Sequence, residues 1–479
     1  MGTGSASLRI ELSEVAVRAG TWPVLRALLL ILGTAGSICL GRFYGLIALS
    51  LVWAPYVFAH PQEGLWVSPG FILTASLISP PEGFVEGVGY SPELAYWAIG
   101  ICVLFTAMLS RHLQALIGAR KTGLVQTAGL IAPRGFYVFA AVSVVAAAVG
   151  VVHGYSLQNV VKQLFGLVLL FAYFIFALRF APRRQDMEHV LNRVVCLAVA
   201  SSVIYTAFYF SVLSVRNFSD HLSVVIAYDG ALFVFLVPRI LRNKLAHIRI
   251  DGTLLIALFF FVVPVLAHLK RVVGACLLCV LLAWGLRSAS RWRRYAYVVA
   301  APLLLAVALS TGVLNPIGAW LSKYQDSEYL IPEDMQNHYS VVTRLAEFNQ
   351  VTESLHGMPI LGNGLGSTLT WYDPFARTYW DQETADNGLL YLLVKMGIAG
   401  TIAFIWFIYP LGFAALQKPL SGLHMSFFLL LVFHLLQMIA DVTFFYFMTA
   451  GWVGTTCAFL YILNNKSENA SSTPACNAI

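Results

Sequence analysis

The sequence predicts an all-α membrane protein, a polytopic bundle of about 13–14 transmembrane helices with one large loop late in the chain. Three observations support this prediction. Of the 479 residues, 59% are hydrophobic and only 11% are charged, whereas soluble domains carry about 25% charged residues. Apolar runs long enough to span about 30 Å of hydrocarbon recur along the chain. Basic residues gather in alternate connections between these runs, as cytoplasmic loops do.

The predicted spans divide the chain into five parts. A charged segment with interspersed apolar residues at 1–22 suits a surface helix, and 23–312 forms the main bundle. The long loop covers 313–387, further spans cover 388–463, and 464–479 is predicted to be a disordered polar tail. Individual spans are expected near 24–40, 43–60, 92–110, 135–153, 160–180, 189–213, 222–241, 252–268, 272–288, 295–312, 388–411, 423–440 and 443–463.

Positive charge predicts the orientation of these spans. The basic clusters that should face the cytoplasm lie at 111–134, 179–184, 239–249 and 287–294. The loop 313–387 then lies on the outer side of the membrane. Its composition agrees, because it holds ten Asp or Glu residues against Lys323, Arg344 and Arg377.

One segment leaves the number of spans open. Residues 64–80 are apolar enough to cross a membrane, but the segment is short and Pro69 and Pro80 interrupt it. If it crosses, there are fourteen spans and the N-terminus is cytoplasmic. If it does not, there are thirteen and the N-terminal arginines face outward. The charge rule favours fourteen.

Composition argues against nucleic-acid and metal chemistry. The formal net charge of +7 is spread over short loops and forms no basic patch. Cys276 and Cys279 form a CxxC pair, but it falls inside a predicted span without the second pair or histidine that a zinc site needs. We therefore expect no metal, no cofactor and no nucleic-acid partner.

A few cations fall on the predicted outer side. Arg216 follows one span, Lys270 and Arg271 lie at the outer end of another, and Arg344 lies in the long loop. Arginines at a membrane interface also serve as simple anchors whose side chains reach the headgroups. Their presence on the side that is normally poor in positive charge favours a second interpretation. Arginine binds phosphate through two parallel hydrogen bonds, so these residues are candidates for a lipid pyrophosphate site.

The long loop ends in two further motifs. The alternate glycines Gly362, Gly364 and Gly366 permit close approach of backbone to a ligand. Asp386 and Asn387 come directly before the next span, where either residue would cap a helix. A carboxylate there can also accept a proton from a sugar hydroxyl.

Aromatic residues gather between these two motifs. Interfacial anchoring is the usual role of such residues near a membrane, and stacking on sugar rings is the alternative that we retain for a glycan-binding site. The candidates for glycan binding are Trp371, Tyr372, Tyr379 and Trp380, together with Asn387 of the adjoining motif.

Taken in order, these motifs resemble the O-antigen polymerase and ligase family (Wzy-type polymerases and related ligases). The family signature has an arginine, P-x-x-G-x-G-x-G, then His-Asn or Asp-Asn before a helix with a Gly-x-x-Gly turn. The matching residues here are Arg344, 359–366, Asp386, Asn387 and 397–400. Arg216 and Arg271 fit two earlier family arginines by position only. Related ligases have His at the place of Asp386, so the likeness favours a polymerase.

The resemblance implies a GT-C-like fold in the bacterial inner membrane with a periplasmic active face. It implies an inverting, metal-independent glycosyltransferase that uses a polyprenyl-pyrophosphate-linked (undecaprenyl pyrophosphate) glycan to extend a second lipid-linked unit. Asp386 would act as the base, Arg344 would clamp the donor, and Arg216, Lys270 and Arg271 would hold pyrophosphate. The product would be O-antigen, capsule or exopolysaccharide, and the partners would include membrane lipid and chain-length regulator or export proteins.

Two other functions stay open from the sequence. A ligase would move a finished glycan to a lipid or protein acceptor in a single transfer. A transporter would perform no chemistry and would place its binding residues near the bilayer midplane. The predicted spans carry little charge in their interior, which favours the enzyme.

Overall fold

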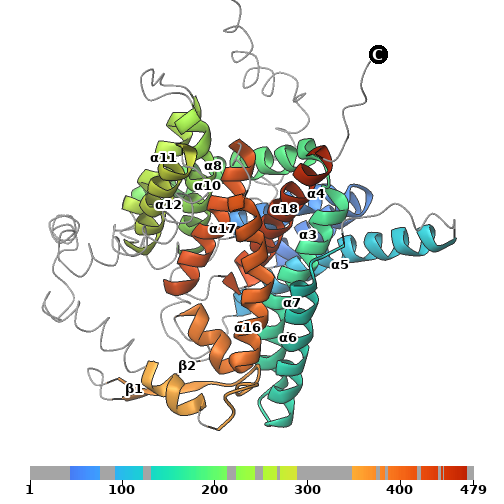
Figure 1. Ribbon diagram of the computed structural model, residues 1–479, viewed down its shortest axis with the longest axis vertical. Helices are drawn as coiled ribbons and strands as arrows, with labels where there is room; N and C mark the ends of the chain where they lie inside the picture. The colour runs from blue at the N-terminus through green and yellow to red at the C-terminus, as the bar shows by residue number, and fades with distance from the viewer. Residues whose placement is uncertain are drawn as a thin grey trace, which may run out of the picture. The chain divides into compact units, whose positions relative to one another are not determined.

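The computed structural model describes the protein over most of its apolar helices (Figure 1). It places the chain in two compact units, the first made of 1–122 and 188–212 and the second of 123–187 and 213–479. We describe each unit by itself. The residues that the structure describes are 44–75, 92–121, 131–212, 223–242, 252–266, 270–288, 348–355, 357–373, 378–382, 387–417, 422–440, 444–445 and 447–471.

The described residues are almost entirely helical. The helices are α3 (Tyr44–Ala59), α4 (Pro61–Ala75), α5 (Pro92–Lys121), α6 (Arg134–Val152), α7 (Leu157–Phe180), α8 (Arg184–Val212), α10 (Ser223–Arg242), α11 (Gly252–Leu266), α12 (Lys270–Ser288), α16 (Gly388–Gln417), α17 (Gly422–Ala440) and α18 (Phe447–Ser471). Two short strands, β1 (Leu369–Asp373) and β2 (Thr378–Gln382), form a hairpin in the predicted outer loop.

Five helices in the described part are long and apolar enough to cross a membrane. Three shorter helical stretches in the described part are also apolar, at Ser50–Ala59, Leu254–Pro264 and Val272–Leu286. Apolar side chains also point outward: along α16, Ile398, Ile402, Ile405 and Tyr409 are about half exposed at helical spacing. Such a stripe suits contact with lipid rather than water. The prediction of a helical, membrane-embedded protein is confirmed at this level.

Several helix boundaries differ from those predicted. The clearest difference is at the C-terminus, where α18 continues to Ser471, beyond the predicted end of the span at residue 463. Asn464 is buried, and its side-chain amide has partners there. Its Oδ1 lies 2.7 Å from Nε2 of His424, and its Nδ2 donates to the carbonyl of Leu411 at 3.0 Å. Because its polar atoms are hydrogen-bonded, this residue can be buried within the helix. The predicted segment 1–22 and the predicted spans 24–40 and 295–312 lie outside the described residues.

In the first unit, α3 and α4 form an antiparallel pair beside α5. Trp53 stacks edge to face on Trp66, with ring centroids 6.1 Å apart, while Gly64 packs against Val57 and Met108. Contacts thus pair later residues of α4 with earlier residues of α3. The connection between α3 and α4 lies beside the second half of α5, where the guanidinium of Arg111 is 6.0 Å from the ring of Phe58.

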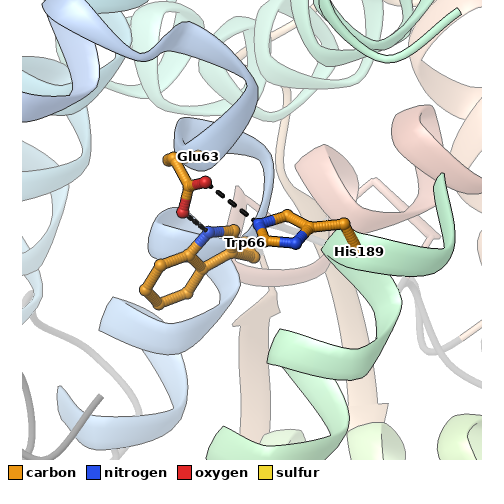
Figure 2. Close-up of polar contacts among 3 residues, drawn as sticks. All are labelled: Glu63, Trp66 and His189. Atoms are coloured by element: carbon orange, nitrogen blue, oxygen red, sulfur yellow. Dashed lines mark hydrogen bonds and ion pairs between the residues drawn. The ribbon is translucent and has the colours of Figure 1, made fainter. Parts of the chain in front are cut away.

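A buried carboxylate joins α4 to α8 in this unit (Figure 2). One oxygen of Glu63 lies 3.0 Å from Nε2 of His189, and the other accepts a 2.5 Å bond from the indole of Trp66. Arg193, one turn after His189, lies over the same indole ring at 5.8 Å. Burial opposes ionisation of Glu63, but its bonds with His189 and Trp66 and the nearby positive charge hold its pKa below the ordinary 4.5.

The core of the second unit is aromatic. Phe136 and Phe139 of α6 pack on Phe174 of α7 and Phe407 of α16. Two glycines bring helix backbones into direct contact. Gly135 of α6 lies on the backbone of Trp406, and Gly454 of α18 lies on the carbonyl of Leu170. Side chains that interdigitate at this density leave α6, α7, α16 and α18 with fixed mutual registers.

The Glu63 network predicts how stability depends on pH. Because the folded-state pKa of Glu63 is lowered, its contribution is fully present above about pH 4.5 and is lost as the pH falls through the lower folded value. Thermal unfolding of Glu63→Gln in detergent should therefore show a melting temperature well below wild type at pH 7, with the gap closing under strong acid. The exposed control Glu353→Gln should follow wild type at every pH. A Glu63→Gln variant as stable as wild type at pH 7 would show that the Glu63 carboxylate does not stabilise the fold.

Candidate functional site

The predicted glycine motif forms a loop, Pro359–Ser367, that packs onto helices α6 and α16; we call it the glycine loop. Its backbone makes regular hydrogen bonds with both helices. The N–H of Leu365 donates to the carbonyl of Ala146 on α6 at 2.9 Å, and the N–H of Gly364 donates to the carbonyl of Lys395 on α16 at 3.1 Å. The loop therefore belongs to the helix bundle and does not extend freely from it.

The glycine loop supplies hydrogen-bond partners to the backbone on both sides of a break in α16. Gly397 has φ 63 and ψ −162 within an otherwise helical segment, so groups on either side lose their partners inside the helix. On one side, the carbonyl of Val394 accepts from Asn363 at 2.7 Å. On the other, the N–H groups of Ile398 and Ala399 donate to Pro359 (2.9 Å) and Ile360 (3.0 Å). In a membrane, freed backbone groups must find such partners.

The three predicted glycines adopt backbone conformations that other residues avoid. Gly362, Gly364 and Gly366 have φ values of 68, 89 and 89. At Gly364 a side chain would also collide with the backbone of Gly150 on α6. The close approach that the sequence predicts does occur, and the partner is the backbone of the chain itself. A ligand contact of these glycines stays a prediction.

Polar side chains fasten the glycine loop from three directions. Oε1 of Gln163 on α7 accepts a 2.7 Å bond from the N–H of Gly366. His153, just after α6, lies 3.0 Å through Nδ1 from the carbonyl of Asn363. The ammonium of Lys395, which is only 1% exposed, donates to the carbonyl of Ser367. The sequence reasoning did not select these three residues.

A signal for one of the missed residues was present in the sequence. Lys395 is the single charge in the apolar run LLYLLVKMGIAG, and charged residues within membrane segments usually have a specific partner and a function. Gln163 and His153 carry no comparable signal, because their partners are about two hundred residues away in the sequence.

The β-hairpin carries the four aromatic candidates. In its antiparallel register Trp371 is opposite Trp380, and Tyr372 is opposite Tyr379. Successive residues of a strand alternate between faces, so the two Trp positions belong to one face and the two Tyr positions to the other. Tyr379 is 72% exposed. Neither interpretation made from the sequence, interfacial anchoring or stacking on sugar rings, predicts the two strands.

Asn387 caps α16 and ties it to α17. Its side-chain oxygen accepts from the N–H groups of Leu389 (2.8 Å) and Leu390 (3.3 Å), and its amide donates to the carbonyl of Ile439 at 2.8 Å. Of the two residues that could cap this helix, the structure uses Asn387. Asp386 lies outside the described residues.

The directions of α10 and α12 place further candidate residues at the end of the second unit where α16 starts. Gly230 of α10 packs on Val272 of α12 and on Phe433 of α17. Farther along, Ser426 of α17 donates to the carbonyl of Phe235 at 2.8 Å. On α12, Val272 lies beside Gly230, and Cys279 contacts the carbonyl of Leu429. Both α10 and α12 thus run antiparallel to α17, and they begin at the end where α17 finishes and α16 starts. Lys270 and Arg271 open α12 at this end.

Some predicted site residues cannot be placed. Arg216, Arg344 and Asp386 lie outside the described residues, although Arg216 precedes the start of α10 and Asp386 directly precedes Asn387 in the chain. Only the backbone is described for Lys270, Arg271, Trp371, Tyr372 and Trp380. The roles predicted for all of them, and the glycan-binding role of Asn387, stay predictions.

Comparison with known proteins adds no constraint. No protein-family model matches this sequence, and no curated protein is significantly similar to it.

The contact between Gly364 and Gly150 predicts a packing effect that can be separated from backbone strain. Gly364→Ala should lower the free energy of unfolding by roughly 3 kcal/mol or more, because it combines a left-handed conformation with a collision against α6. Gly154→Ala is the matched control. It has a similar φ of 79 but open space around it, so strain alone should cost about 1 kcal/mol.

Both variants can be compared with wild type by chemical unfolding in detergent. Equal destabilisation by the two substitutions would show that Gly364 is needed only for its backbone conformation, and the docking of the glycine loop on α6 would then be wrong.

Proposed function

We propose that this protein polymerises lipid-linked oligosaccharide units at the outer, periplasmic face of a bacterial inner membrane. The observation that carries the proposal is the glycine loop. It fixes the hairpin with its aromatic residues and the start of α16 at one end of a membrane-helix bundle. The starts of α10 and α12 lie at that same end. Lys270 and Arg271 open α12, and Arg216 precedes α10 in the sequence. Aromatic and basic groups on one membrane face suit a glycan attached to a lipid pyrophosphate.

The distribution of positive charge supports placing this end outside. The opposite ends of α6 and α7 carry Arg134, Arg179, Arg183 and Arg184, and such clusters face the cytoplasm. In the first unit, α3 leads to the same end as the second half of α5 with Arg111, and α4 turns back antiparallel to α3. This return path favours the fourteen-span arrangement, in which 64–80 crosses and the N-terminus is cytoplasmic.

In the proposed reaction, a hydroxyl oxygen of the acceptor glycan attacks the anomeric carbon of the donor. The bond from that carbon to the pyrophosphate oxygen breaks, and the polyprenyl pyrophosphate leaves with the electron pair. Asp386 takes the hydroxyl proton as general base. Arg216, Lys270, Arg271 and Arg344 stabilise the negative charge that develops on the leaving pyrophosphate, which requires no metal. Attack opposite the leaving group inverts the anomeric carbon.

The position of Asp386 supports a role as base. Asn387 supplies the cap of α16, and Asp386 directly precedes it in the sequence, where the helix dipole favours a negative charge.

The test is polymerisation by purified protein. Wild type in detergent, given a polyprenyl-pyrophosphate-linked repeat unit from the host pathway, should produce a ladder of products on a gel. Asp386→Asn should reduce the rate by about 10²-fold or more, because it removes the proton acceptor while keeping the size of the side chain. Arg271→Lys should also impair transfer, because lysine lacks the two parallel donors.

The control and the alternatives are read from the same gels. Arg183→Gln removes an exposed cation at the opposite end of the bundle and should leave the ladder unchanged. A single shifted product formed only with a separate acceptor would identify a ligase. Wild type that binds the lipid-linked unit but forms no product would support the transporter. A normal ladder from Asp386→Asn would refute the assignment of the base.

Orientation has its own test. In a background without the seven native cysteines, single cysteines replace the exposed residues Gln158, in the first turn of α7, and Gln185, in the first turn of α8 just beyond the other end of α7. A membrane-impermeant maleimide should label Gln158→Cys in intact spheroplasts and Gln185→Cys only after permeabilisation. The reverse pattern would place the glycine loop in the cytoplasm and exclude a periplasmic active face.

A further inference from the structure

Lys395 is a buried cation in the first half of α16. Only 1% of its surface is exposed, and its ammonium donates to the backbone carbonyl of Ser367. The ring of Tyr391, one turn earlier on the helix, lies 5.8 Å from the ammonium. Burying a cation costs several kcal/mol before its partners are counted. A methionine of similar length would fill the space without that cost, so the charge is expected to have a specific use.

The partner of Lys395 is the point where the glycine loop ends and the hairpin begins. Ser367 is buried, and its hydroxyl donates to the carbonyl of Gly364 at 2.9 Å. Two residues later, Leu369 starts β1, is 3% exposed, and pairs with Gln382 at the end of β2. A bond to the carbonyl of Ser367 therefore fixes the base of both strands.

The chain leaves the hairpin toward a second fixed point. Only four residues separate Gln382 from Asn387, whose side chain is held by the carbonyl of Ile439. In the sequence, Asp386 therefore falls between an anchor at the hairpin base and an anchor at the helix cap. The first of these anchors depends on Lys395.

We propose that Lys395 is a positioning residue that fixes the β1–β2 hairpin at the start of α16 through the carbonyl of Ser367. The anchor itself does not depend on any activity. Its consequence for catalysis rests on the proposed function: the hairpin would hold the acceptor glycan beside Asp386, and Lys395 would set that geometry without touching substrate.

The surrounding contacts give the proposal a local signature. The other bonds of the glycine loop do not involve the ammonium of Lys395. They join the loop backbone to Ala146, Val394 and Ile398, and Gly366 to Gln163. Removing the ammonium should therefore loosen 368–382 while leaving 359–366 as protected as before. A residue that merely filled space would not separate these two adjacent segments.

Hydrogen exchange measured by mass spectrometry tests this signature on the full-length protein in detergent. In Lys395→Met, amides of 368–382 should exchange about tenfold faster or more, and amides of 359–366 should be unchanged. Lys395→Arg keeps a cationic donor and should restore most of the protection. Arg183→Met, a cation removed from the opposite end of α7, should match wild type throughout.

Two results would overturn the proposal. Exchange in 368–382 that is the same in Lys395→Met and wild type would show that the ammonium does not hold the hairpin. Faster exchange spread over both segments, with no recovery in Lys395→Arg, would show that Lys395 supports the helix break as a whole and not the hairpin in particular.

A kinetic comparison separates this proposal from the proposed function. If wild type forms polymer, Lys395→Met should raise KM for the lipid-linked unit by about tenfold and change kcat much less, because a loosened hairpin weakens binding of the glycan without removing the base. Unchanged KM would overturn the role in glycan positioning. If wild type forms no polymer, the proposed function fails, and the exchange experiment still decides whether Lys395 anchors the hairpin.

Discussion

The break in α16 at Gly397 is the constraint on which the end of the second unit with the glycine loop depends. A membrane helix normally satisfies all its own backbone groups, and an interruption leaves donors and acceptors that lipid cannot satisfy. Here the glycine loop satisfies them as a short strand would, giving N–H groups to the helix before the break and carbonyls to the helix after it. The loop can approach this closely only because glycines stand where side chains would collide with α6 and α16.

These contacts explain how the glycine loop, which is not part of a helix, acquires a fixed position. Its start, middle and end are bonded to α16, α6 and α7, and the hairpin follows directly from the bonded segment. Functional residues on loops are useful only when a rigid scaffold holds them. The break in the helix is thus compensated by the same contacts that give the neighbouring hairpin and the cap of α16 a defined place.

Much of the fold followed from the sequence because membrane helices are encoded locally. Hydropathy predicted most of the described helices, although it left 64–80, which overlaps α4, open. Alternate basic clusters predicted which ends of the helices lie together. Contacts between distant segments were not predictable in the same way. The glycines indicated close approach, but Gly150 is more than two hundred residues from Gly364, and nothing local identifies it as the partner. The choice of Asn387 over Asp386 as cap likewise depends on the carbonyl of Ile439, which belongs to another helix.

The long separation between the glycine loop and α6 has a consequence for biosynthesis. The bond between His153 and Asn363 joins residues 210 positions apart, and the helix break needs residues up to Ala399 to be present. At about 5–20 residues per second, roughly 10–40 s pass between synthesis of the α6 end and arrival of its partner. During that interval the ends of α6 and α7 lack the glycine loop as a partner, so their packing is completed only after the chain has been synthesised to Ala399.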